Sequence, residues 1–173
     1  DEALATILGE VLSRRSDIHV VCTGGGIPGF YTDGYARFQS FAANFPDRIT
    51  LHGWLPHSEM AAVLQGAHAG ISIDRPGPEP ELGSRTRLLL FAHLGLMPIS
   101  TVRCDLARSW QAAGALHPLP FQDIDGAIET LIDLEIDTRV TAKAQAFSQE
   151  HFSIATVTTP LLEWCAHPVR TAP

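Results

Sequence analysis

The residues best suited to bind an anion lie between Glu81 and Thr86, where the sequence is Glu-Leu-Gly-Ser-Arg-Thr. An apolar helical pattern, 88–94, follows directly. The first turn of a helix has unpaired backbone N–H groups, and the helix dipole favours negative charge there. The guanidinium of Arg85 and the hydroxyls of Ser84 and Thr86 would add charge-assisted hydrogen bonds. This chemistry predicts a site for a phosphorylated small molecule.

Alternating strand and helix patterns must position this stretch. Short continuous apolar runs between amphipathic segments are typical of parallel strands that helices cover on both faces. The sequence therefore predicts an α/β fold, a Rossmann-like doubly wound parallel sheet. The expected strands are 18–22, 49–52, 69–73, 97–100 and 116–119, and the expected helices are 2–14, 35–42, 56–64, 84–94, 105–112, 123–134, 137–149 and 154–166.

The carboxyl ends of such strands form the ligand crevice of a doubly wound sheet. The loops 23–34, 53–57, 74–84 and 101–105 all follow expected strands. Trp54 lies in the second loop, where it either stacks on a base or fills a gap. Asp74 begins the third, where it either binds a ligand or caps the loop.

Residues 24–29, Gly-Gly-Gly-Ile-Pro-Gly, match the letters of the dinucleotide-binding fingerprint G-x-G-x-x-G. Pro28 and the glycines up to Gly34 delay the helix that should begin inside that motif. The following strand ends in His52-Gly53 without an acidic residue. A tight turn that lets the backbone at Gly24 and Gly25 approach a neighbour or a ligand is the favoured interpretation.

Composition restricts the class of protein. The 173 residues suffice for one domain with a sizeable core, and the net charge of −7 argues against general nucleic-acid binding. The sequence contains no run of about 18 apolar residues, so it predicts no membrane span. Cys22, Cys104 and Cys165 are too widely spaced to predict a disulfide or zinc site, Cys22 being expected as a structural thiol in a strand. We expect no metal and a cytoplasmic location.

Five segments together resemble one known family. The ordered set resembles the C-terminal, donor-binding domain of a GT-B glycosyltransferase of family 4 (group 1), over roughly residues 1–166. The segments are Thr23–Gly26, Leu51–Pro56, Ala67–Asp74, Glu81–Leu89 and Gly95–Pro98.

The resemblance implies roles for individual positions. The backbone at Gly53, Trp54 and Leu55 would meet the nucleobase, and Glu81 would contact the donor sugar. The diphosphate would be held by Gly83, Ser84, Arg85 and Thr86, with Glu81 and Arg85 as the catalytic pair. The acidic residue that holds the ribose in this family falls on Leu90, which has no acceptor atom.

The resemblance also implies an activity and a partner. The whole enzyme would transfer a hexosyl group from a nucleoside-diphosphate sugar to an acceptor, without a metal or other cofactor. We expect residues 1–173 to form a single domain that lacks the family's first strand and its N-terminal acceptor domain. This domain is expected to be inactive by itself. The alternatives are a non-catalytic nucleotide-binding or regulatory module, half of a sugar-nucleotide epimerase, and a structural interaction domain. An epimerase should carry clustered acids and histidines, and only Asp74 and Glu81 qualify.

Overall fold

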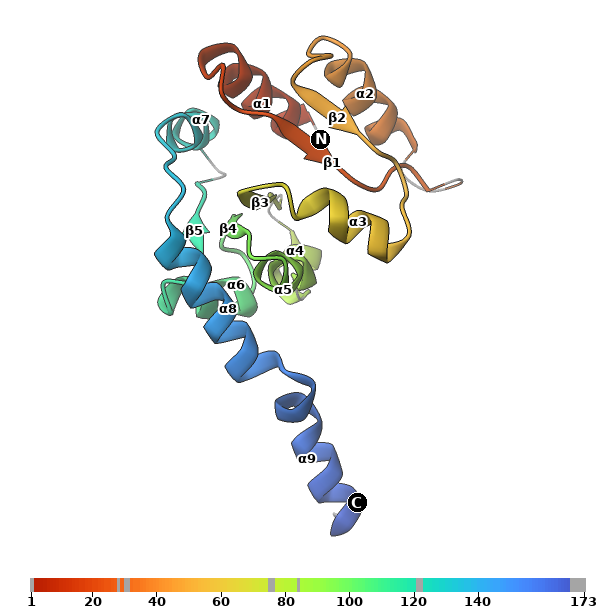
Figure 1. The fold of residues 1–173 in the computed structure, drawn as a ribbon, viewed down its shortest axis with the longest axis vertical. Coiled ribbons are helices and arrows are strands. Elements are labelled where there is room, and N and C mark those ends of the chain that lie inside the picture. The colour runs from red at the N-terminus through yellow and green to blue at the C-terminus, as the bar shows by residue number, and fades with distance from the viewer. Residues whose placement is uncertain are drawn as a thin grey trace.

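The computed structural model describes residues 2–27, 29, 32–74, 77–83, 85–120 and 123–168. Helices and strands alternate along the first two thirds of the chain, and helices complete it (Figure 1). In chain order the elements are α1 (Glu2–Arg14), β1 (Val20–Cys22), α2 (Thr32–Ala42), β2 (Ile49–Leu51), α3 (His57–Leu64), β3 (Ala69–Ser72), α4 (Pro78–Leu82), α5 (Thr86–His93), β4 (Met97–Ser100), α6 (Asp105–Ala112), β5 (His117–Pro118), α7 (Ile124–Ile132), α8 (Thr138–Phe152) and α9 (Ile154–Ala166).

The strands are parallel, as the alternation of strands and helices predicts. Within the described residues they form two hydrogen-bonded sheets, one of β1 and β2 and one in the order β3-β4-β5. Val20 pairs with Ile49 in the first sheet, and Ile71 pairs with Ile99 in the second. The expected α/β class with parallel strands is confirmed, whereas one continuous sheet is not seen, because no ladder joins β1 to β3.

Helix α1 connects the two sheets through its apolar face. Ile7 and Val11 pack in one buried cluster with Ile99 and the inner face of α7. One residue further along, Leu12 packs with Ile49 of the first sheet. Because apolar residues at helical spacing reach both sheets, a single amphipathic helix holds them together.

Helix α5 lies directly against β3, because Gly70 has no side chain. A Cβ atom added at Gly70 would lie 2.3 Å from the ring of Phe91 on α5, well inside van der Waals contact. Leu88 and Phe91 are both buried. This close approach sets the position of the N-terminus of α5 relative to the carboxyl end of β3.

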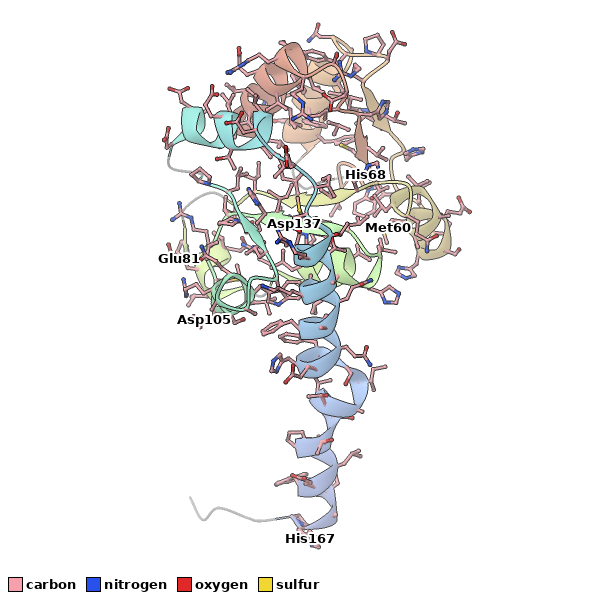
Figure 2. All side chains as sticks on the ribbon, turned by 60° about the vertical axis from the view of Figure 1, so that its left-hand side comes forward. Met60, His68, Glu81, Asp105, Asp137 and His167 are labelled. Atoms are coloured by element: carbon pink, nitrogen blue, oxygen red, sulfur yellow. The ribbon has the colours of Figure 1, made fainter. Side chains whose placement is uncertain are left out.

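Helices α8 and α9 extend away from the sheets (Figures 1 and 2). Phe147 of α8 packs edge-on against Trp110 of α6, at 5.7 Å between ring centroids. Helix α9 exposes large apolar side chains, among them Ile154, which is 81% exposed, and Trp164. Among the described helices, none combines the length and apolarity needed to cross a bilayer.

The expected helices and strands agree with the structure within a few residues at their ends, and one helix was not expected. Residues 74–84 were expected to be a loop, and helix α4 lies inside that segment. Gly77 stands at its N-cap, Pro78 occupies its first turn, and Glu79 and Glu81 add acidic residues there. A proline in the first turn and acids near the N-terminus both favour helix initiation, so the local sequence accounts for this short helix.

Candidate functional site

The carboxyl ends of β3 and β4 are joined by a buried hydrogen bond. The backbone N–H of Asp74, two residues beyond β3, donates to Thr101 Oγ1 at 3.0 Å. Thr101 directly follows β4, and both residues are buried. The structure thus places these two side chains at the edge of the sheet where parallel α/β proteins bind ligands.

Arg85 lies at the centre of an ion cluster with Asp74 and Glu79. Its Nε donates to Asp74 Oδ2 at 2.6 Å. Its Nη1 and Nη2 donate to the two carboxylate oxygens of Glu79 at 2.9 and 3.0 Å. We call these three residues the Arg85 cluster. The paired geometry with Glu79 is the bidentate arrangement that a guanidinium favours.

Burial makes the two ion pairs of the Arg85 cluster unequal. The side chains of Arg85 and Asp74 are 7% and 9% exposed, whereas that of Glu79 is 82% exposed. The hydrogen bonds to Glu79, and then those to Asp74, raise the pKa of Arg85 above its usual value. The same contact lowers the pKa of Glu79 below its usual value of 4.5. Arg85 and Glu79 therefore both carry their charges at neutral pH.

Helix α4 explains why Glu79 rather than Glu81 meets Arg85. Two residues on an α-helix lie about 200° apart, so the two glutamates point to opposite sides. The side chain of Glu81 is exposed and has no hydrogen-bond or ion-pair partner among the described residues. The expectation that Glu81 contacts a donor sugar stays a prediction, and the contact of Glu79 with Arg85 was not expected from the sequence.

The predicted anion-binding stretch is partly occupied by the protein itself. The N–H of Gly83 donates to Glu79 O at 2.9 Å, and a Cβ at Gly83 would lie 2.7 Å from that oxygen. Each guanidinium nitrogen of Arg85 already donates to a carboxylate, and Ser84 lies outside the described residues. Thr86 is exposed, and its hydroxyl has no partner in the described part of the chain.

Arg87 lies beside Thr86 in the first turn of α5 and is also exposed. It makes one long hydrogen bond, from Nη1 to Ser72 Oγ at 3.4 Å. The residue at the N-cap, Arg85, makes no side-chain hydrogen bond to the helix, so the first N–H groups of α5 are not capped by it. Thr86, Arg87 and these N–H groups form the part of the predicted stretch that is open to an anion.

The glycine loop after β1 meets the loop after β2. Gly24 N donates to Gly53 O at 2.6 Å, and both glycines have positive φ. Trp54 Nε1 donates to Gly26 O at 3.3 Å, and the indole stands beside Gly25 while remaining 68% exposed. Leu55, the next residue, is half-buried.

The structure therefore brings the sequence-predicted residues together in two groups. Gly24, Gly25 and Trp54 form one group at the ends of β1 and β2. Asp74 and Arg85 belong to the other, at the ends of β3 and β4. Within the described chain, no hydrogen bond or ion pair joins the two groups.

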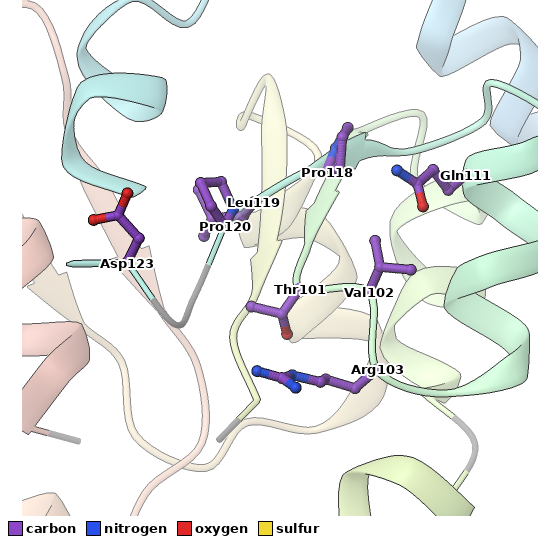
Figure 3. A pocket seen from close by; sticks show the side chains of 8 residues that line it. All are labelled: Thr101, Val102, Arg103, Gln111, Pro118, Leu119, Pro120 and Asp123. Carbon is purple, nitrogen blue, oxygen red and sulfur yellow. The ribbon is translucent and has the colours of Figure 1, made fainter. Parts of the chain in front are cut away.

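A pocket of about 480 Å³ opens at the carboxyl ends of β4 and β5 (Figure 3). Thr101 belongs to its wall as well as to the bond with Asp74, so the pocket adjoins the Arg85 cluster. The sequence analysis placed the loop 101–105 at this edge but did not single out Arg103, which follows Thr101 by two residues. The lining residues are Thr101, Val102, Arg103, Gln111, Pro118, Leu119, Pro120 and Asp123.

The three cysteines are free thiols, and burial raises the pKa of Cys22 above its usual value. The Sγ of Cys104 accepts a hydrogen bond from Ala107 N at the start of α6. Among the described residues, no group of three or more His, Cys, Asp or Glu side chains is arranged to hold a metal ion.

No protein-family model matches the chain, and no curated protein matches it.

Proposed function

We propose that this chain is the nucleotide-sugar-binding domain of a glycosyltransferase of the GT-B fold. The observation that carries the proposal is the grouping of Asp74, Thr101 and Arg85 at the carboxyl ends of parallel strands, next to a pocket. Ligands of open α/β sheets bind at this edge. The ordered motifs that resemble family 4 supply the substrate class, a nucleoside-diphosphate sugar.

In this proposal the nucleobase lies on the loops after β1 and β2. The exposed indole of Trp54 offers a flat surface for stacking. Gly24 and Gly25 keep the neighbouring backbone free of side chains, and Leu55 adds an apolar edge. This part of the site would bind a nucleoside with or without phosphates.

The diphosphate lies at the N-terminus of α5, between Gly83 and Arg87. Thr86 and the guanidinium of Arg87 contact the phosphate oxygens in this proposal. Arg85 acts as a positioning residue, because its donors already hold Asp74 and Glu79. When the sugar–oxygen bond breaks, negative charge grows on the departing diphosphate, and fixed donors at a helix N-terminus stabilise such charge.

The two sheets belong to one doubly wound sheet in this proposal. The inner edges of β1 and β3 have no strand partner among the described residues. A further parallel strand between them would restore the order of a continuous sheet, and an N-terminal acceptor domain would face the carboxyl edge. The acceptor hydroxyl would then reach the donor sugar from that second domain.

Calorimetric titration of the chain with UDP, GDP, ADP and their glucose conjugates tests the proposal. We expect one nucleotide series to bind, and a hundredfold excess over Kd to stabilise the fold by about 2.7 kcal/mol. Arg87→Ala should weaken diphosphate binding about tenfold, since charged hydrogen bonds contribute about 1.5–3 kcal/mol. The same variant should bind the matching nucleoside with unchanged affinity. Arg139→Ala, which removes an exposed arginine on α8, is the matched control. No binding across the panel would reject the proposal.

A non-catalytic nucleotide-binding module is the second candidate, and Leu90 favours it. Leu90 lies on α5 where the family holds the ribose with an acid, and its side chain cannot accept a hydrogen bond. Such a module should bind a nucleoside diphosphate and its sugar conjugate with equal affinity. A donor-binding domain should bind the conjugate more tightly, because the sugar adds contacts.

A further inference from the structure

Arg103 is distinguished from the other described arginines by the absence of any partner. The others donate to carboxylates, hydroxyls or backbone carbonyls, or have another interaction. The Arg103 side chain makes no hydrogen bond or ion pair within the described residues, although it is half-buried. A guanidinium that is partly removed from water gains most from an anion that it can bind by several hydrogen bonds.

The Arg103 side chain lines the pocket at the ends of β4 and β5. Figure 3 shows it extending from the loop after β4 to a position below Thr101. The pocket, at about 480 Å³, falls within the range of about 300–1,000 Å³ that small-molecule sites occupy. The unpaired cation therefore faces a space large enough for a small ligand.

The rest of the wall is suited to a hydroxylated ring. Val102 and the prolines 118 and 120 form an apolar surface, against which the C–H face of a sugar ring can pack. Gln111 and Asp123 stand on opposite sides of that surface in Figure 3. An amide and a carboxylate supply the donors and acceptors that sugar hydroxyls need.

Asp123 excludes a ligand that is anionic throughout. Its Oδ1 accepts a hydrogen bond from Gly126 N at 3.0 Å and so caps α7. The other carboxylate oxygen, Oδ2, has no partner among the described residues, and it can accept from a hydroxyl. Arg103 therefore attracts an anion on one side of the pocket, and Asp123 repels it on another. This arrangement selects a molecule whose negative charge lies at one end.

We propose that this pocket binds a sugar phosphate, with the phosphate on Arg103 and the hydroxyls on Asp123 and Gln111. The site is separate from the diphosphate position at α5, and it requires no nucleotide. Thr101 connects the two, because its hydroxyl accepts from Asp74 N while its side chain lines the pocket. The chain thus has one position for a nucleotide sugar and another for a phosphorylated sugar.

Isothermal titration with glucose 6-phosphate, glucose and inorganic phosphate tests this pocket. Wild-type protein should bind glucose 6-phosphate saturably, with Kd below about 1 mM, and bind the other two compounds more weakly. Arg103→Met, which keeps an unbranched apolar stem, should weaken glucose 6-phosphate binding about tenfold or more, as expected for a lost charged hydrogen bond. Arg103→Lys should recover part of the loss. Arg139→Ala, which removes an exposed arginine on α8 outside the pocket, should change nothing.

Asp123→Asn separates the two ends of the ligand. Asparagine caps a helix as well as aspartate does, so α7 should remain intact. The variant should bind glucose 6-phosphate several-fold more weakly, because a neutral amide is a weaker acceptor than a carboxylate. It should bind inorganic phosphate as well as or better than wild type, because a negative charge has been removed. Circular dichroism confirms the fold of each variant.

The outcomes separate this inference from the proposed function. Glucose 6-phosphate binding that depends on Arg103 supports the pocket even if no nucleotide binds. Nucleotide binding without any glucose 6-phosphate binding overturns the pocket and leaves the donor site standing. Equal affinity of wild type and Arg103→Met for glucose 6-phosphate also overturns it.

Discussion

Arg85 and Arg103 stand at the same edge of the sheet, yet their surroundings are opposite. Arg85 is buried and donates to two carboxylates, Asp74 and Glu79. Arg103 is half-buried, faces a pocket and has no partner among the described residues. A guanidinium whose donors are already used holds the protein together, whereas one with unused donors is available to a ligand.

Arg85→Met should produce the largest effect on stability. It would leave the carboxylate of Asp74 buried without its cation, and breaking a buried pair in this way costs about 3 kcal/mol or more. Urea unfolding at pH 7 measures the loss. A loss below about 0.5 kcal/mol would show that the Arg85 cluster does not hold the segment 74–85.

The pair itself can be isolated by a double-mutant cycle. Asp74→Ala and Arg85→Met should each destabilise the protein, and the double variant should be less unstable than the sum by about 2 kcal/mol, within the range for residues in contact. Urea unfolding of the two single variants and of the double variant measures this coupling free energy. Additive losses would mean that the two side chains stabilise the fold separately.

Glu79→Gln should have a smaller effect that depends on pH. Because Arg85 lowers the pKa of Glu79 below 4.5 in the folded state, the pair stabilises the protein above pH 4.5. That stabilisation is lost as pH falls through 4.5 toward the lowered pKa. The variant should therefore be less stable than wild type at pH 7, and the difference should shrink at pH 3 to 4. A difference that stays constant with pH would exclude the ionised pair as its cause.

Arg103→Met should have the smallest effect on stability, within about 0.5 kcal/mol of wild type, because it breaks no contact. Its effect should fall on ligand binding instead. Thermal unfolding of Arg103→Met and of Arg85→Met, both without ligand, measures the difference in stability between the two variants. A destabilisation as large as that of Arg85→Met would remove the distinction between the two arginines.

Periodicity predicted most of the fold correctly. Apolar residues at helical spacing located α1, and α9 has the expected bounds, 154–166. Short apolar runs located the five strands seen among the described residues, and the helices between them indicated their parallel direction. The helix α4 was missed because a segment with three prolines between 76 and 80 favours a loop, although Pro78 in the first turn is compatible with a helix.

The candidate site was less predictable, because it depends on which side chains meet. Asp74, Arg85 and Trp54 were identified from their places after strands or at a helix start. Their partners were not, because Glu79 and Glu81 differ only in which side of α4 they face. Arg103 has no local motif, and only its place beside a pocket distinguishes it.

The sequence by itself determined the alternation of strands and helices, the edge of the sheet at which polar residues gather, and the identity of the charged groups there. These features follow from the spacing of residues along the sequence, which does not depend on the folded structure. Tertiary structure decided which charges neutralise one another and which stay open, because this depends on distances between residues 74, 79, 85 and 103. Packing of α5 on Gly70 of β3 and the turn of α4 fix those distances, and no local pattern encodes them.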